Sequence, residues 1–491
     1  MKNLPAVLAA LLSLGFATHA AAASARPPNV LFIAMDDLRT DLGCYGDPLA
    51  ITPHLDQLAA RGMVFKHAYC QVAVCNPSRA SLMTGRRPDS IRVWDLKTHF
   101  RTNVPDVVTL PQHFKAHGYH SEAIGKIFHD PPKFRDAPSW SVPAQLDDTE
   151  AVRGKYAHPD NLRIYQPNGR PGQEKAAATE AAEVPDNDYI DGRVADLAIA
   201  RLRAVAAQPS PFFLAVGFRR PHLPFSAPQR FWDLYDPAKL KTVPHPEPPR
   251  GAPALALHDS PELRGYTDMP ELGPVSPDKV ATLRHGYYAA TSFSDAQVGR
   301  VLSALREQDL EKNTIVVVWG DNGYHLGEHG LWSKTTNYEV DTRVPLIIAY
   351  PGQPHPGAAT SALVELLDVY PTLVDLCGLP VPAGLEGRSL RPWLESPGRT
   401  GPAAAFSQFA RPWPYGKQPE VMGYAVRTAT HRYIEWRRFG TREVVDRELY
   451  ALDGEQLFET ENLADRPAEA ARVRELAALL PARVLERTNS L

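Results

Sequence analysis

One cysteine of this chain lies at a position suited to chemistry, in the stretch Cys75-Asn76-Pro77-Ser78-Arg79. The residues from there to Thr84 predict a short helix that ends at Gly85, with Ser78 able to cap its first turn. Cys75 would then face unpaired amide N–H groups and the partial positive charge of a helix N-terminus, where anions bind. Single cysteines are most often small buried apolar residues. The predicted helix end makes Cys75 a candidate for chemistry on an anion.

Two pairs of oxygen-bearing side chains follow two predicted strands. The apolar run of residues 29–35 ends at Asp36-Asp37, and the run of residues 314–319 leads to Asp321-Asn322. Single aspartates after a strand most often form turns or helix caps. Adjacent carboxylates repel each other, however, and a set of hard oxygen donors suits Ca²⁺ or Mg²⁺, with an all-protein cage favouring Ca²⁺. We therefore predict a Ca²⁺ site made of Asp36, Asp37, Asp321 and Asn322.

Basic side chains follow the other predicted strands. Lys126 and His129 come after residues 119–124, and His222 comes after the apolar run of residues 212–218. Isolated basic residues are most often solvated surface groups. In a parallel sheet, however, the carboxyl ends of the strands share one edge, and binding sites form there. The sequence thus predicts a single charged site at one edge of the sheet.

The segment His325-Leu326-Gly327-Glu328-His329 fits the His-x-x-Glu-His pattern of one class of zinc proteases. That chemistry needs a helix that presents both histidines on one face. Gly320, Gly323, Gly327 and Gly330 crowd the segment, and glycine is costly in a helix. We therefore expect a loop near the metal site, in which the histidines are structural or touch substrate.

The elements that must position these residues alternate between strands and helices. Helices are expected over residues 52–61, 109–118, 188–206, 277–308 and 366–377, and another strand over residues 344–349. This order predicts an α/β fold with a mostly parallel sheet between two layers of helices. After residue 396 short alternating runs predict a smaller antiparallel α+β domain, with a final helix over residues 467–486. The expected division is residues 27–396 and 397–491.

Composition and charge narrow the function classes. A chain of 491 residues is long for a single core, which favours two domains. The net charge of -3 provides no general field for nucleic acid, so an anionic substrate must meet local basic residues. Residues 1–23 have the basic start, short apolar stretch and small residues of a signal peptide, which predicts export to the periplasm or medium, and we expect no membrane insertion. Four cysteines are too few for a disulfide framework.

Several motifs together resemble the type I sulfatase family, and within it the iduronate-2-sulfatase group, over most of the chain. The first is Cys-x-Pro-Ser-Arg at Cys75 with the following Thr-Gly-Arg, a signature whose cysteine the family oxidises to formylglycine, or 3-oxoalanine. The others are Met35-Asp36-Asp37-Leu38-Arg39, Gly125-Lys126-Ile127-Phe128-His129, Arg220-Pro221-His222-Leu223-Pro224-Phe225 and the segment from Gly320 to Lys334. The stretch Glu448-Leu449-Tyr450-Ala451-Leu452 is similar to the family's C-terminal domain.

The resemblance implies an alkaline-phosphatase-like fold and a sulfuric ester hydrolase that acts on a sulfated carbohydrate. It implies that the modified Cys75 joins the ligands of one Ca²⁺ ion. It also implies that Arg79 holds the formylglycine and that His129 contacts the hydrated aldehyde. Three further residues are implied to bind the sulfate, namely Lys126, His222 and Lys334. The partners it implies are a sulfated mono-, oligo- or polysaccharide and the formylglycine-generating enzyme.

The chemistry can be followed from the functional groups alone. An aldehyde hydrate has two hydroxyl groups on one carbon, so that one attacks sulfur and expels the alcohol. The other then loses its proton, to His129, as the carbonyl re-forms and sulfate leaves. His222 or Lys334 is the candidate proton donor to the departing sugar alkoxide. Two alternatives remain open: a phosphodiesterase or phosphonate monoester hydrolase of the same superfamily, and a catalytically silent polysaccharide-binding protein.

The chain departs from the iduronate-2-sulfatase pattern near the site. That group carries His where this chain has Asn322, Trp at Tyr324, Lys at Arg220 and Tyr at Thr335. These differences leave sulfate ester hydrolysis intact as an expectation and leave the sugar undetermined. A further hypothesis is that sulfate or carboxylate groups of a polymer bind to a set of arginines and a lysine, namely Arg86, Arg87, Lys97, Arg101, Arg219 and Arg220.

Overall fold

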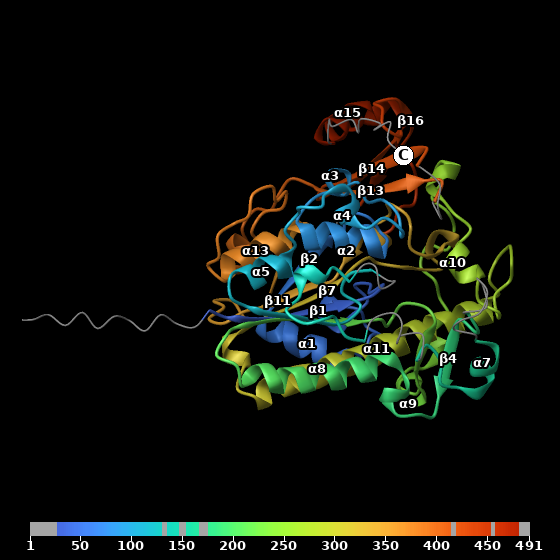
Figure 1. Ribbon diagram of the computed structural model, residues 1–491. Helices are drawn as coiled ribbons and strands as arrows, with labels where there is room; N and C mark the ends of the chain where they lie inside the picture. Colours follow the sequence, from blue (N-terminus) through green and yellow to red (C-terminus); the bar gives the residue numbers. More distant parts are fainter. Residues whose placement is uncertain are drawn as a thin grey trace, which may run out of the picture.

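The computed structural model describes residues 27–129, 135–146, 154–165, 175–413, 419–452 and 457–480 (Figure 1). The expected signal peptide of residues 1–23 lies outside these ranges. None of the helices within them combines the length and the apolar character that a membrane span needs.

A mostly parallel sheet forms the centre of the described fold. Its strands are β1 (Asn29–Met35), β2 (Met63–Tyr69), β3 (His120–Gly125), β5 (Phe212–Phe218), β7 (Thr314–Gly320), β10 (Arg343–Val344), β11 (Leu346–Ala349) and β12 (Ala358–Glu365). The order across the sheet is β10-β2-β11-β7-β1-β5-β3, with β12 also paired to β2. β1, β3, β5 and β7 run parallel to one another. The α/β fold class expected from the alternation of strands and helices is therefore confirmed.

The expected strand over residues 344–349 is two short strands. β10 pairs antiparallel with the C-terminal end of β2. β11 pairs antiparallel with the N-terminal end of β2 and also with β7. Pro345 separates them, and because proline has no N–H to donate, it interrupts the hydrogen-bond ladder at that point. The antiparallel direction of β11 could not be read from an apolar run alone.

The two faces of β1 pack into two separate cores, as expected for a strand that is buried on both sides. Val30, Phe32 and Ala34 belong to one apolar cluster, whereas Leu31 and Ile33 belong to the other. Side chains of a strand point alternately to opposite faces, which explains this division. Figure 1 shows helices over both faces of the sheet. Those on one face are α2 (Cys75–Thr84), α5 (Leu110–Ala116) and α13 (Val369–Leu376), and those on the other are α1 (Pro53–Arg61), α8 (Ile190–Ala206) and α11 (Pro277–Glu307).

Shorter elements fill the long excursions between these units. They are α3 (Pro88–Ile91), α4 (Phe100–Asn103), α7 (Pro159–Ile164), α9 (Gln229–Trp232), α10 (Pro261–Arg264), α12 (Glu339–Thr342), α14 (Arg391–Glu395), β4 (Thr179–Ala182), β6 (Phe225–Pro228), β8 (His325–Leu326) and β9 (Trp332–Ser333). The helix expected over residues 366–377 begins as the 3-10 turn η9 (Leu366–Asp368) and continues as α13.

A second, antiparallel sheet follows in the chain and lies on the side of the α2 layer (Figure 1). Its strands are β13 (Ala405–Arg411), β14 (Val421–Arg427), β15 (His431–Arg438) and β16 (Val444–Ala451), and α15 (Ala470–Leu479) packs on them through Leu476. The smaller antiparallel unit expected after residue 396 is thus present. The division at residue 396 falls between α14 and β13, and it stays a prediction, as does the part of the final helix beyond residue 480.

Candidate active site

The register of the parallel strands explains why their ends meet. Met35 of β1 lies opposite both Phe218 of β5 and Gly320 of β7, and Gly125 of β3 lies opposite Gly217 of β5. The residues that follow these strands therefore begin at the same level of the sheet edge. Asp36, Lys126 and Asp321 are the first residues beyond their strands, so they come together although they are far apart in sequence.

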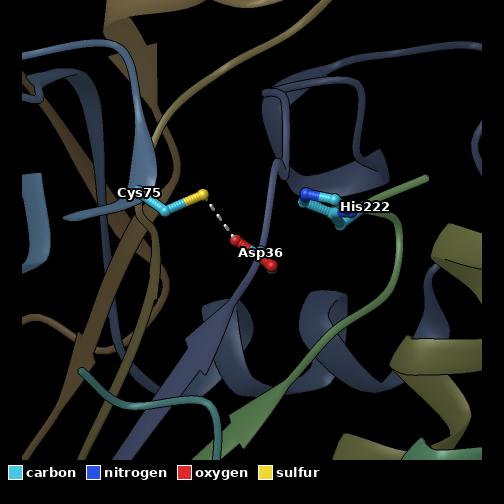
Figure 2. A group of neighbouring side chains, drawn as sticks. All are labelled: Asp36, Cys75 and His222. Carbon is cyan, nitrogen blue, oxygen red and sulfur yellow. Dashed lines mark hydrogen bonds between the residues drawn. The ribbon is translucent and has the colours of Figure 1, made fainter. Parts of the chain in front are cut away.

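Cys75 begins α2 and points toward that edge. Its side chain is buried, and its thiol donates to Oδ1 of Asp36 across 3.3 Å. Figure 2 shows Asp36 between Cys75 and His222. The expected cap differs from the observed one, because Val74 occupies the N-cap and the Ser78 hydroxyl instead donates to the Asp321 carbonyl. Burial, with the Asp36 charge adding to it, raises the pKa of the Cys75 thiol well above its ordinary value, so the unmodified side chain is a neutral thiol.

Arg79 lies one turn further along α2 and is fully buried. Its Nε donates to Oδ2 of Asp321 at 2.7 Å, and its Nη1 donates to the carbonyls of Lys126 at 2.6 Å and Ile127 at 3.0 Å. Its Nη2 also lies 3.3 Å from Oδ1 of Asp36. Arg79 thus ties together α2, the end of β3, the end of β7 and the end of β1.

Three carboxylates gather beside Cys75. Ligand oxygens of Asp36, Asp37 and Asp321 lie within 4.8 Å of one another, and all three side chains are buried. Oδ1 of Asp321 accepts from the amides of Asp37 and Asn322, each at 3.0 Å. The Tyr287 hydroxyl donates to the Asp37 carbonyl at 2.7 Å, which fixes the backbone at this bend.

The shared environment drives the carboxylate pKa values apart. Burial is the largest influence on Asp36 and opposes ionisation, yet Lys126, His222 and Arg79 outweigh it and hold that pKa well below its ordinary value. Burial raises the pKa of Asp321 to about 6; Arg79 opposes this shift, and the charges of Asp36 and Asp37 add to it. The charges of Asp36 and Asp37 thus oppose ionisation of Asp321, and a cation bound among the three carboxylates would relieve this repulsion.

Lysines from two other segments meet these carboxylates. Nζ of Lys126 lies 2.6 Å from Oδ2 of Asp36, and Nζ of Lys334 lies 2.7 Å from Oδ2 of Asp37. With Arg79, three cationic side chains balance the three carboxylates. A divalent cation bound among them would leave the site with a net positive charge, which suits an anionic substrate.

The donor set fits a hard divalent cation. Asn322 donates through Nδ2 to Oδ1 of Asp37 at 2.8 Å, whereas its Oδ1 is buried and has no hydrogen-bond partner in the part of the chain that the structure describes. A buried amide oxygen without a donor is costly unless it binds something. This oxygen and the three carboxylates are the ligand type that Ca²⁺ takes in proteins. Cys75 and His222 also have ligand atoms within 4.8 Å of Asp36.

Glu262, on α10, belongs to the site and was missed by the sequence reasoning. Its carboxylate lies 2.9 Å from Nζ of Lys334 and 3.2 Å from Nε2 of His222. Nδ1 of His222 lies 2.7 Å from the Leu223 carbonyl, which only accepts, so Nε2 is the ring nitrogen that faces Glu262. No motif marks Glu262 within the proline-rich segment where it lies, and only the fold brings it to Lys334.

A pocket opens above these groups. Its lining includes the buried side chains of Cys75, Lys126 and Lys334 and the partly buried side chains of His129 and His222. The remaining lining is uncharged apart from Glu262 and comes from several segments, namely Val74, Leu96, His258, Pro261, Glu262, Ser333, Thr335 and Trp413. All six residues for which the resemblance implies a catalytic role therefore lie in or directly beneath one pocket.

The histidine motif does not form a zinc site. β8 and the 3-10 turn η8 (Glu328–Gly330) replace the helix that such a site needs. Nδ1 of His325 pairs with Oδ1 of Asp341 at 2.7 Å, and its Nε2 lies 3.1 Å from Nδ1 of His329. Glu328 instead pairs with Arg39 at 2.9 Å. The expectation of a structural loop near the metal site agrees with this geometry.

The hypothesis of a basic surface for a polymer is wrong for at least three of its residues. Arg87 pairs with Glu365, and Arg101 pairs with Asp136. Arg220 is buried and donates to backbone carbonyls, among them that of Ser226 at 3.0 Å. These three side chains are therefore engaged within the fold. The carboxylates that pair with Arg87 and Arg101 lie in distant segments, which the sequence order does not reveal.

Comparisons with known proteins show which families and relatives this chain is similar to. A family model described as sulfatase matches residues 28–379, and one described as the C-terminal region of N-sulphoglucosamine sulphohydrolase matches residues 327–484. The chain is 35% identical to iduronate 2-sulfatase of Homo sapiens over 87% of this chain and 90% of that protein. It is 33% identical to a sulfatase of Formosa agariphila over 92% of this chain and 86% of that protein.

This chain is also similar to a solved structure whose name gives an activity other than sulfate ester hydrolysis. A phosphonate monoester hydrolase from Silicibacter pomeroyi superposes with a TM-score of 0.73 at 27% identity, covering 92% of this chain and 94% of that one.

Proposed function

Because this chain belongs to the sulfatase family and is a sulfuric ester hydrolase, we propose that it removes sulfate from a sulfated carbohydrate, with a formylglycine made from Cys75 and one bound Ca²⁺. One observation above all supports this proposal. The side chain of Cys75 lies 3.3 Å from Asp36, at the point where three buried carboxylates and three buried cations meet.

Each group would have a distinct part in the reaction. The hydrated aldehyde at position 75 would supply an attacking hydroxyl and, on the same carbon, a second hydroxyl through which sulfate is released. Ca²⁺ held by Asp36, Asp37, Asp321 and Asn322 would supply positive charge next to the sulfate oxygens. The protein side chains described above would orient these groups and exclude water around them.

The cationic side chains would bind the sulfate. Lys126 and Lys334 present their ammonium groups to the pocket, held by Asp36 and Asp37. Burial lowers the pKa of Lys334, but Asp37 and Glu262 outweigh it and hold that pKa well above its ordinary value, so the side chain keeps its charge. Fixed charges in a site that excludes water stabilise developing negative charge without reorganisation.

Two histidines that line the pocket, His222 and His129, would carry out the proton transfers. Nε2 of His222 faces the pocket and would donate a proton to the leaving alkoxide, a role that Lys334 could also fill. His129 lines the pocket beside Cys75 and would accept the proton of the second hydroxyl. Both roles need only the reach of a hydrogen bond to the reacting oxygen.

The sugar itself is proposed only as a class. Similarity to iduronate 2-sulfatase favours a carbohydrate ester. Of the positions that differ from that group, Thr335 lines the pocket, whereas Arg220 is buried and is not part of the lining. A smaller side chain at Thr335 would leave a different space for the sugar. The partners would be the sulfated saccharide and, during maturation, the formylglycine-generating enzyme, and we propose that the protein is exported.

The decisive experiment combines mass spectrometry and sulfate release. Peptide mass spectrometry of protein from a host with the maturation enzyme should find an aldehyde at position 75, and that protein should release sulfate from some members of a panel of sulfated sugars. Cys75→Ala should release none, whereas Cys44→Ala should remain active. An unmodified thiol at position 75 in fully active protein would defeat the formylglycine proposal. Undiminished biological effect of Cys75→Ala would favour the silent polysaccharide-binding alternative.

The alternative of a phosphonate monoester hydrolase is favoured by one observation, the similarity to the structure from Silicibacter pomeroyi. The same pocket groups would bind a phosphonate or phosphodiester. Rates on matched aryl sulfate, phosphonate and phosphodiester substrates separate the two proposals. A clear preference for phosphorus esters would overturn the choice of sulfate.

A further inference from the structure

Glu262 is the one carboxylate among the described residues that line the pocket. Its neighbours in the lining are uncharged or cationic. A carboxylate beside a sulfate repels it, so this residue weakens sulfate binding unless it interacts favourably with another part of the substrate.

The position of Glu262 is fixed by its own segment. The Ser260 amide donates to Nδ1 of His258 at 2.9 Å, and Oγ of Ser260 accepts from the Trp332 amide at 2.9 Å. The Glu262 carbonyl accepts from Nζ of Lys175 at 2.8 Å, and the side chain of Leu263 is fully buried. The carboxylate is therefore held in place before a substrate arrives.

Glu262 keeps capacity for another hydrogen bond. Oε1 lies 3.2 Å from Nε2 of His222, and both carboxylate oxygens lie near Nζ of Lys334, at 3.1 Å and 2.9 Å. An ionised carboxylate can accept about four hydrogen bonds. The side chain also remains 19% exposed, on the side of the pocket. A substrate donor can therefore reach it.

The partners of Glu262 define which part of the substrate it meets. Lys334 is proposed to bind the sulfate and His222 to protonate the leaving oxygen, so the carboxylate between them would lie beside the carbon that bears the ester. Resting on the proposed sulfatase function, we propose that Glu262 accepts a hydrogen bond from a hydroxyl or amino group vicinal to the sulfate ester, and so selects esters that carry such a donor.

The test uses two sulfates that differ by one hydroxyl group: trans-2-hydroxycyclohexyl sulfate and cyclohexyl sulfate. Hydrogen bonds to charged groups predict that kcat/KM of the matured enzyme favours the hydroxy ester by about 10- to 100-fold. In Glu262→Gln the ratio of the two kcat/KM values should fall several-fold, because a neutral amide oxygen accepts a weaker hydrogen bond than a carboxylate, even if both rates also fall because His222 and Lys334 shift. The matched control is Glu271→Gln, in the same loop but exposed, which should keep the wild-type ratio.

The outcomes are separable. A wild-type enzyme without preference, an undiminished preference in Glu262→Gln, or no turnover of the hydroxy ester by an enzyme that hydrolyses 4-nitrophenyl sulfate would each overturn the role of Glu262. Absence of sulfate release from 4-nitrophenyl sulfate as well would instead overturn the proposed function itself.

Discussion

Glu459 provides the sharpest physical prediction, because it is a buried carboxyl whose pKa is shifted into the neutral range. It lies behind the loop that carries Asp321 and Lys334. Its Oε1 accepts from the Glu339 amide at 2.9 Å and lies 3.1 Å from Nε of Arg432, while its Oε2 lies 3.8 Å from Nε2 of His329. Burial raises the pKa of Glu459 to about 7; Arg432 opposes this shift and the charge of Glu339 adds to it.

The sign and size of the effect follow from linkage. The unfolded chain releases this proton near the ordinary value of 4.5, whereas the folded chain holds it until about pH 7. The folded protein therefore gains stability from the bound proton below pH 4.5 and loses that gain as the pH rises toward about 7. A pKa difference of this size corresponds to about 3 kcal/mol in the free energy of unfolding.

The assay is urea denaturation of the wild type and Glu459→Gln between about pH 5 and pH 8, followed by tryptophan fluorescence. Glutamine stays neutral, so the variant should gain about 3 kcal/mol relative to the wild type over that range. The control Glu461→Gln removes a partly exposed carboxylate two residues away, which pairs with Arg250 and Arg466, and should show no such trend. A difference between wild type and Glu459→Gln that is the same at every pH would refute the reasoning.

Three further predictions follow from the packing. Gly217→Ala places a Cβ 2.0 Å from the Lys126 carbonyl, so it should lower kcat/KM by about 10-fold or more through displacement of Lys126, as steady-state kinetics would measure. Arg432→Met leaves Glu339 buried without its closest cation and should cost about 3 to 5 kcal/mol in urea denaturation, whereas Arg438→Met at the surface should cause a much smaller loss of stability; equal losses would contradict the buried-pair argument. Removal of divalent ions with EDTA should both stop sulfate release and lower the melting temperature, and Ca²⁺ should restore both; full activity in EDTA would contradict the Ca²⁺ proposal.

Much of the fold follows from the sequence because local patterns suffice to determine it. The apolar runs of β1, β5 and β7 are buried on both faces, as their lack of alternation predicts. The helix that begins at Cys75 ends at Gly85, which adopts the left-handed conformation that such a helix end requires. Residues that follow parallel strands must share an edge, which is why the order of the strands is enough to group Asp36, Lys126 and Asp321.

What the sequence by itself determined is therefore the set of elements and the residues at their ends. Only the tertiary structure decided which charges remain available for a ligand, because each ion pair depends on a partner in a distant segment. It assigned Arg87 and Arg101 to internal pairs, and it brought Glu262 to Lys334, 72 residues away. Such pairings leave no local pattern, since a carboxylate on a loop has the same sequence signature whether it meets solvent or a lysine in the pocket.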